Sequence, residues 1–155
     1  MKVKAEINGL WTCTQCGRQF ERQGQSHSCK AFPLKQHFEG KPGGTLFYKI
    51  FKQAVKRQIG HFRIESLECC IHFVNTSTFA SIKIMREKIK VEFSLARKIS
   101  NKRLKQPVQL SANSFLYFVN ISSEDEIDGT LLKWIKEAYK RRSRRKSKSL
   151  VAYYF

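Results

Sequence analysis

Four cysteine and histidine side chains near the N-terminus have the spacing of metal ligands. Cys13 and Cys16 form a Cys-x-x-Cys turn, Gly17 follows it, and His27 and Cys29 come shortly afterwards. Thiolates and imidazole are preferred ligands of Zn²⁺, and three cysteines with one histidine complete a tetrahedral set that leaves no open position. We therefore predict a structural zinc site on Cys13, Cys16, His27 and Cys29.

The spacing within the second pair distinguishes among zinc architectures. His27 and Cys29 are two residues apart, which suits an extended segment, whereas a finger helix places its ligands three to five residues apart. The sequence favours a ribbon or knuckle, with Trp11 and Phe20 as its miniature core. A redox Cys-x-x-Cys pair or unligated thiols are the alternatives, but a redox pair is expected before a helix in a βαβ setting.

The remaining reactive residues do not suggest an active site. Cys69 and Cys70 fall in an apolar stretch with period two, which predicts a strand with the two side chains on opposite faces and Cys69 in the core. The other histidines are scattered, and the sequence has no phosphate-binding loop of the Gly-x-x-x-x-Gly-Lys type. We expect a protein that is not an enzyme.

Charge is concentrated at the two ends of this 155-residue chain. The net charge is +18, of which residues 1–60 contribute +8, residues 61–132 contribute +2 and residues 133–155 contribute +8. Five cysteines without an apolar leader argue against a secreted disulfide scaffold, and no apolar run approaches the length of a membrane span. We expect a cytoplasmic protein without a membrane span.

The pattern of apolar residues predicts an α+β fold behind the zinc head. Helical spacing over residues 45–60 predicts a helix with Thr45 as its N-cap, and alternation predicts antiparallel strands at 67–73, 80–84 and 89–95, with a fourth near 115–121. Ser123 and Glu126 form a capping box that begins a final helix. We divide the chain into a zinc-binding head (1–32), a linker (33–44), an α+β domain (45–142) and a basic and apolar tail (143–155).

The final helix runs into a dense cluster of cations. Such a run binds DNA or RNA through non-specific phosphate contacts, although it also occurs as a solvated helix end. The residues that we assign to nucleic-acid binding are Lys140, Arg141, Arg142, Arg144, Arg145, Lys146 and Lys148. The alternative is a small-ligand or protein-interaction module, in which the apolar segment 150–155 docks on the domain or binds a protein partner.

Several of these segments resemble a known family. They are Trp11–Phe20, Gln25–Cys29, Pro33–Pro42, Phe79-Ala80, Lys88–Phe93 and Glu124–Asp128 with Trp134 and Glu137–Tyr139. Together they are similar to the bacterial domain-of-unknown-function family number 5655, over nearly the whole chain to about Tyr139. The resemblance implies a compact α+β domain, often with a metal-type head, and similar domains are appended to nuclease-like or other nucleic-acid-linked modules.

Overall fold

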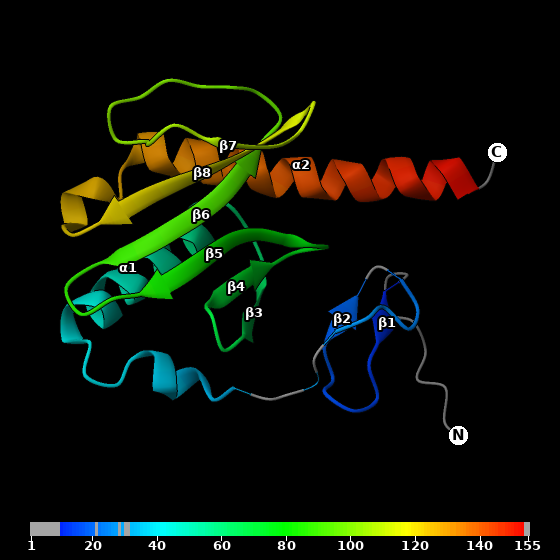
Figure 1. Cartoon of the computed structure of the whole chain (residues 1–155), viewed down its shortest axis with the longest axis horizontal. Helices are drawn as coiled ribbons and strands as arrows, with labels where there is room; N and C mark the ends of the chain where they lie inside the picture. The colour runs from blue at the N-terminus through cyan, green and yellow to red at the C-terminus, as the bar shows by residue number, and fades with distance from the viewer. Residues whose placement is uncertain (1–9, 21, 28, 30–31, 154–155) are drawn as a thin grey trace.

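The computed structural model describes residues 10–20, 22–27, 29 and 32–153, with side chains described as far as Arg141. It confirms the α+β class (Figure 1). A small sheet in the head pairs β1 (Trp11–Thr12) with β2 (Gln19–Phe20). A larger antiparallel sheet has six strands, two more than the sequence analysis predicted, and lies against the helices α1 (Pro42–Gln58) and α2 (Gly129–Tyr153).

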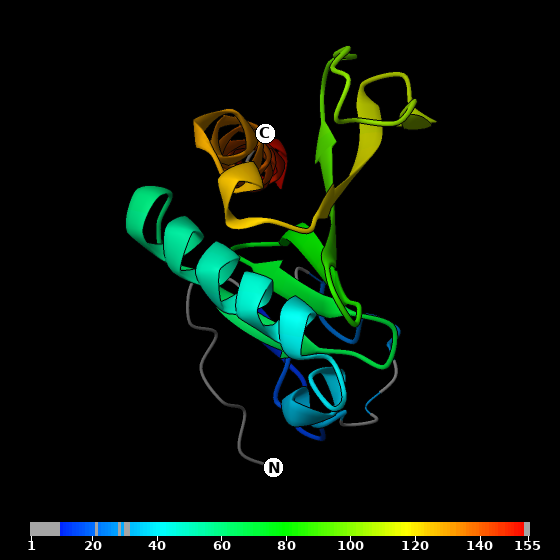
Figure 2. The same cartoon turned by 90° about the vertical axis from the view of Figure 1, so that its left-hand side faces the viewer.

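The strands of the large sheet follow the order β3-β4-β5-β6-β8-β7. Their bounds are Arg63–Ser66, Ile71–Val74, Thr78–Ile84, Ile89–Leu95, Ser114–Ile121 and Val108–Ser111, in that spatial order. Strands β5, β6 and β8 confirm the predicted strands at 80–84, 89–95 and 115–121. Both helices lie on one side of the sheet, which we call the inner face, and the opposite side is the outer face (Figure 2). None of the described helices is long and apolar enough to cross a membrane.

The core lies between the inner face and the two helices. Strand residues that alternate with polar ones point inward and are buried, as the period of two requires. The helix α2 supplies Leu131, Trp134, Ile135 and Ala138 to this core. In α1 the buried side chains are Tyr48, Phe51 and Val55, whereas Leu46 is exposed.

The start of α1 differs from the prediction. The helix begins at Pro42 with Lys41 as its N-cap, and Thr45 lies inside it with its hydroxyl donating to the Lys41 carbonyl over 2.7 Å. Proline suits the first helical position because its fixed φ is helical and no hydrogen bond is lost there. The Gly44 amide donates to the Arg86 carbonyl (3.2 Å), so the first turn of α1 lies directly against the β5–β6 turn.

The start of α2 also differs. Ser123 precedes a short 3₁₀ turn (Glu124–Glu126), whose last residue, Glu126, accepts hydrogen bonds at its carboxylate from the Ser122 and Ser123 hydroxyls. The helix itself begins at Gly129, and Asp128 caps it by accepting from the Leu131 amide over 2.9 Å. The predicted capping box does not form, because Ser123 makes no side-chain cap bond and the Glu126 carboxylate accepts from the Ser122 amide instead. An Asx cap at Asp128 starts the helix.

Two strands, β3 and β7, were not predicted. The predicted strand at 67–73 is the turn and second arm of a β3–β4 hairpin, closed by the Leu67 amide donating to the Cys70 carbonyl over 3.0 Å. All four residues of β7 are exposed, including the apolar Val108 (49% accessible) and Leu110 (56%). The strand therefore lacks the alternate buried residues that mark a strand in sequence.

The close approach at Gly44 gives a matched test of the fold. A Cβ on Gly44 would lie 2.0 Å from the Met85 carbonyl oxygen, whereas a Cβ on Gly129 would meet nothing within 4 Å. We expect Gly44→Ala to lower the free energy of unfolding by about 1–3 kcal/mol or more through overpacking. Gly129→Ala should leave it unchanged or raise it by up to about 1 kcal/mol. Urea denaturation measures both, and equal effects of the two changes would contradict this packing.

Candidate metal centre

A tight turn that connects β1 to β2 holds the first two cysteines of the head. The Cys13 amide donates to the Arg18 carbonyl and the Gly17 amide to the Cys13 carbonyl, both over 2.9 Å. Gly17 has a φ of 74°, a left-handed conformation that glycine adopts without a Cβ penalty. The Cys-x-x-Cys-Gly sequence thus folds as the turn that the sequence analysis predicted.

The turn and the segment that follows β2 bring all four predicted ligands together. The Cys13 and Cys29 sulfurs are 3.6 Å apart, and the His27 Nε2 lies 3.4 Å from the Cys16 sulfur and 3.3 Å from the Cys29 sulfur. The four donor atoms all lie within 4.8 Å of one another, a group that could hold a metal ion.

A backbone carbonyl orients the imidazole of His27. Its Nδ1 lies 2.6 Å from the Gln25 carbonyl oxygen. Because a carbonyl can only accept, Nδ1 carries the proton and the lone pair of Nε2 is directed at the sulfurs. Metal-binding histidines are commonly fixed in this way by a hydrogen bond from the other ring nitrogen.

Three rings surround the donor group and replace a larger core. The Phe20 ring lies 4.2 Å from the His27 ring between centroids, and Trp11 lies 5.9 Å from each of them. Trp11 and Phe20 are also direct cross-strand partners, which confirms that they form the miniature core of the head. Few other apolar side chains of the described head join this cluster, so it is too small to stabilise the head by burial alone.

The cysteines differ in how readily they lose a proton. A hydrogen bond from the Cys16 backbone amide lowers the pKa of Cys13 to about 6, so that this thiol is largely ionised at neutral pH. The pKa of Cys29 is raised to about 11, chiefly by its hydrogen bond with the Cys13 sulfur. One thiolate is therefore ready to meet a cation, and binding must displace the proton of Cys29.

A second Cys/His group was not predicted. Cys69, Cys70 and His72 offer donor atoms within 4.8 Å of one another, and the two sulfurs are 2.7 Å apart. The expectation that these cysteines point to opposite faces is wrong, because Cys69 lies in the β3–β4 turn rather than in a strand. Cys69 is also exposed and not part of the core. A hairpin turn without glycine or asparagine gives little signal in a sequence.

The structure places two of the seven predicted nucleic-acid-binding side chains. Lys140 is exposed on α2, whereas Arg141 donates to the Asn113 carbonyl over 2.9 Å and lies within 3.4 Å of the Ser94 and Ser114 hydroxyls. Arg141 thus ties α2 to the β7–β8 turn. The other five lie beyond the described side chains, on a helix backbone that continues to Tyr153. The predicted docking of residues 150–155 also lies outside the described side chains.

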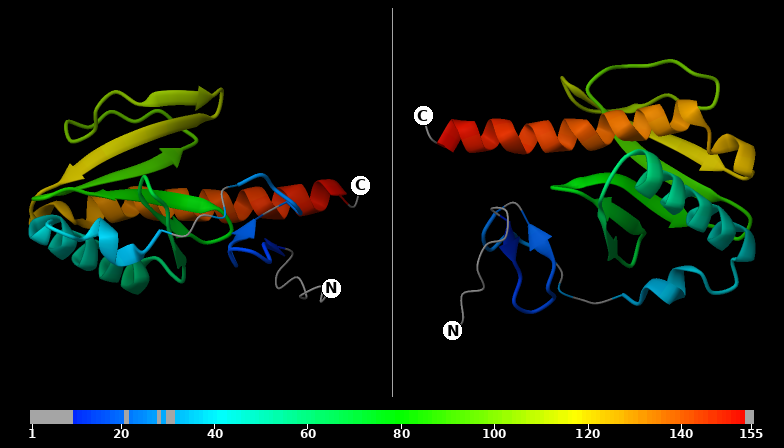
Figure 3. Two further views of the ribbon diagram at one scale, coloured as in Figure 1. Left: turned by 60° about the horizontal axis from the view of Figure 1, so that its bottom comes forward. Right: turned by 180° about the vertical axis from the view of Figure 1, so that it is seen from behind.

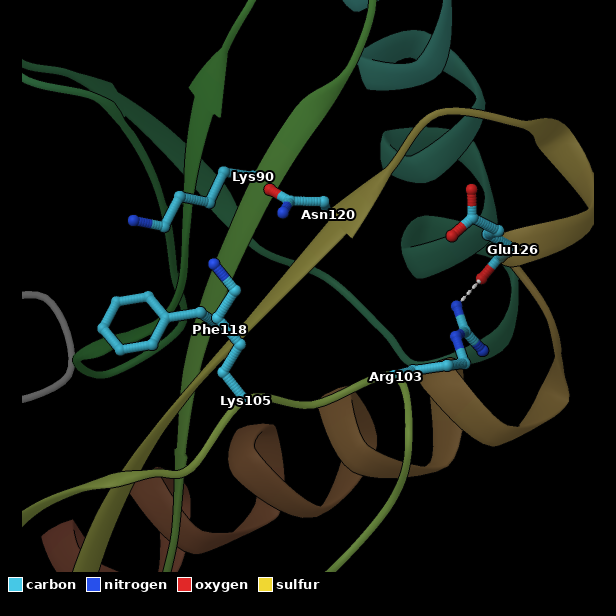
Figure 4. Close-up of a pocket in the computed structure, with 6 residues that line it drawn as sticks. All are labelled: Lys90, Arg103, Lys105, Phe118, Asn120 and Glu126. Atoms are coloured by element: carbon cyan, nitrogen blue, oxygen red, sulfur yellow. Dashed lines mark hydrogen bonds between the residues drawn. The ribbon is translucent and has the colours of Figure 1, made fainter.

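A shallow pocket on the outer face was missed as well. It has a volume of about 220 Å³ and is lined by Lys90, Arg103, Lys105, Phe118, Asn120 and Glu126 (Figure 4). In the sequence, Phe118 is one of three aromatic residues in the strand predicted near 115–121. The signal that separates it from Tyr117 is only the strand alternation, which places neighbouring residues on opposite faces.

A small Cys/His head joined to an antiparallel α+β domain defines the class of this protein. The chain belongs to the family described as Domain of unknown function (DUF5655), whose model matches residues 35–141. The match begins after the Cys/His head, so the part of the resemblance that lies in the head is outside the matched residues. Comparisons with curated proteins and with solved structures gave no match.

The two cysteine groups should differ in reactivity. In zinc-loaded protein at neutral pH we expect iodoacetamide to modify the exposed Cys69 first, because a bound metal and the fold would protect Cys13, Cys16 and Cys29. Burial raises the pKa of Cys70 to about 12, so its adduct should form slowly. Peptide mass spectrometry locates the adducts. A chelator should expose the three head cysteines, and equal labelling of all cysteines before chelation would contradict the assignment.

Proposed function

We propose that the protein is a non-enzymatic zinc-binding protein of the cytoplasm that associates with nucleic acid through the basic end of α2. The separation of the four donor atoms carries the zinc part of this proposal. The continuation of α2 through the cationic run supports the nucleic-acid part.

The donor separations match the edges of a zinc tetrahedron. Zn–S bonds of about 2.3 Å and Zn–N bonds of about 2.0 Å place sulfurs about 3.8 Å apart and sulfur about 3.5 Å from nitrogen. The head has 3.6 Å between the Cys13 and Cys29 sulfurs, with 3.4 and 3.3 Å from sulfur to Nε2. The sulfurs of Cys69 and Cys70, 2.7 Å apart, are too close to occupy two corners of the same tetrahedron. Zinc therefore suits the head better than the β3–β4 turn.

The zinc site would be structural. Four protein ligands leave no position for water or substrate, and catalytic zinc usually has three. In the head, zinc binding would supply the stability that the small ring cluster cannot. The described residues of the large core begin at Tyr48, with Leu34 and Phe38 packed against them, so this core does not depend on the head.

The basic end of α2 extends away from the domain. Among the described side chains of α2, which end at Arg141, Ala138 is the last buried one, and the helix backbone continues to Tyr153, past the edge of the sheet (Figures 1 and 3). We call residues 142–153 the basic extension. At 1.5 Å per residue it is about 18 Å long. Four cations of the proposed site (Arg142, Arg144, Arg145 and Lys146) fall within its first five residues.

Such a charge density favours a polyanionic partner. Closely spaced cations on one helix repel one another. A duplex carries one phosphate charge per about 1.7 Å of its axis, so it would neutralise these cations while releasing its own counterions. Contacts of this kind position a protein on the backbone without reading sequence. The proposed association is therefore non-specific and strongly dependent on salt.

Loss of one zinc ligand tests the metal assignment. We expect wild-type protein to carry about one zinc per chain, Cys16→Ser to lose it, and the matched control Cys69→Ser to keep it. Elemental analysis of the purified proteins measures this directly. In Cys16→Ser the emission of Trp11 should shift to the red as the head unfolds, while the thermal transition of the sheet domain is retained. Zinc-free wild-type protein would overturn the proposal.

Charge neutralisation at two places tests the nucleic-acid assignment. We expect Arg142→Gln/Arg144→Gln/Arg145→Gln/Lys146→Gln to weaken binding to a 20-base-pair duplex and to lower the slope of log affinity against log salt by about 3–4. The control Lys49→Gln/Lys52→Gln/Lys56→Gln/Arg57→Gln removes the same charge from α1. Fluorescence anisotropy across salt compares them. Equal losses in both variants would show that net charge, rather than the basic extension, causes binding.

A further inference from the structure

Neither of the two described α-helices covers the outer face of the large sheet (Figure 2). Its exposed and half-exposed positions form two rows across the strands β5, β6 and β8. The registers place Lys83 opposite Lys90 and Lys90 opposite Asn120 in one row, and Ser81, Glu92 and Phe118 in the other. An aromatic ring thus lies on an open sheet surface, one row away from two neighbouring lysines.

The pairing of Lys83 with Lys90 is unfavourable in the isolated protein. Side chains directly opposite one another on adjacent strands are within interaction distance, and like charges at such positions destabilise a sheet. The Lys90 ammonium is 3.9 Å from the Glu92 carboxylate and 4.6 Å from the centre of the Phe118 ring. One carboxylate cannot neutralise both lysines, so this row retains positive charge that an anionic ligand would stabilise.

A third lysine reaches the same surface from a loop that is held in place. Lys105 lines the pocket with Lys90, Phe118 and Asn120, and its side chain extends toward the latter two (Figure 4). Arg103, two residues earlier, binds both carboxylate oxygens of Asp128 at 3.0 Å. The guanidinium of Arg103 also donates to the Glu126 carbonyl (Figure 4).

The same loop is fixed at its other end. The Tyr117 hydroxyl donates to the Arg97 carbonyl over 3.0 Å and accepts from the Ile99 amide over 2.7 Å. Arg97 forms a two-pronged ion pair with Glu137 on α2. The loop therefore presents Lys105 from a fixed backbone, which lowers the entropic cost of binding a ligand there.

The chemistry of this surface fits an unpaired nucleotide. The half-buried Phe118 ring, over which the Lys90 ammonium lies, offers a platform for a base when that lysine moves to a phosphate. The lysines around the ring suit the flanking phosphates, and the Asn120 amide can bond a base edge. A pocket of about 220 Å³ is smaller than typical enclosed small-molecule sites, so it suits one base of a longer strand. The second acid near the pocket, Glu126, directs its carboxylate to Ser122 and Ser123. Bases in a duplex are already stacked and cannot reach the ring.

We propose that the outer face of the sheet binds single-stranded nucleic acid, with one base stacked on Phe118 and the adjacent phosphates on Lys83, Lys90 and Lys105. This inference rests on the proposed association with nucleic acid and adds a preference for unpaired strands. The basic extension supplies general affinity for phosphates, whereas Phe118 distinguishes a single strand from a duplex.

Two substitutions of Phe118 separate stacking from charge. The probes are a fluorescein-labelled 12-nucleotide thymidine strand and a 12-base-pair duplex, titrated with full-length zinc-loaded protein. We expect Phe118→Leu, which keeps apolar bulk but removes the ring, to weaken binding of the single strand at least about fivefold and to leave the duplex within about twofold. Phe118→Tyr, which keeps the ring, should bind both like the wild type. Lys83→Gln/Lys105→Gln should lower the single-strand salt slope by about 1.4, since each phosphate contact on a single strand contributes about 0.7.

The outcomes distinguish this inference from the proposed function. Single-strand affinity that is unchanged in Phe118→Leu would overturn the stacking site, while a loss in the basic-extension variant would still support the proposed function. Equal losses of single strand and duplex in Phe118→Leu would also overturn it, because stacking would then not be the cause. No binding of either probe by the wild type would overturn both. Thermal unfolding of each variant shows whether the fold is retained.

Discussion

A stack of three rings joins the last helix to the middle of the sheet. The Trp134 ring of α2 lies 6.1 Å from that of Phe93 on β6, at an angle of 15°, and Phe93 lies 5.7 Å from Tyr117 on β8. The direction in which α2 leaves the domain depends on this contact. Tyr117 in turn fixes the loop that carries Arg103 and Lys105. The basic extension and the outer-face pocket are therefore both positioned by buried aromatic packing.

The head is stabilised in a different way from the sheet domain. Its rings pack on one another and on His27, and the Arg63 guanidinium of the large sheet donates to the Gln19 carbonyl over 3.2 Å. A bound metal would therefore order the head with little effect on the large core. The head and the basic extension nevertheless leave the domain at the same end (Figure 3).

The features predicted best from the sequence are those that a local pattern determines. Alternation located β6 and β8, and ligand spacing located the four residues of the head, because both constraints are local. The β3–β4 turn was missed because residues 67, 69, 71 and 73 keep their apolar alternation through it, so one strand and a hairpin look alike. Cys69 and Cys70 were misplaced for the same reason. Asp128 replaced Ser123 as the cap of α2 because several acceptors compete in that segment, and only tertiary contacts decide among them.

Position in the sheet gives neighbouring residues opposite roles, which composition cannot show. Tyr117 and Phe118 are adjacent aromatics, yet one is fully buried and holds the loop while the other lies on the outer face. The outer face belongs to the nearly neutral middle of the chain, where counting charges suggests no polyanion site. Register changes that conclusion, because it sets Lys83 directly opposite Lys90, and Glu92 forms its ion pair with Lys90. Local charge at a fixed ring, rather than the total of +18, is what would give this protein a preference among nucleic acids.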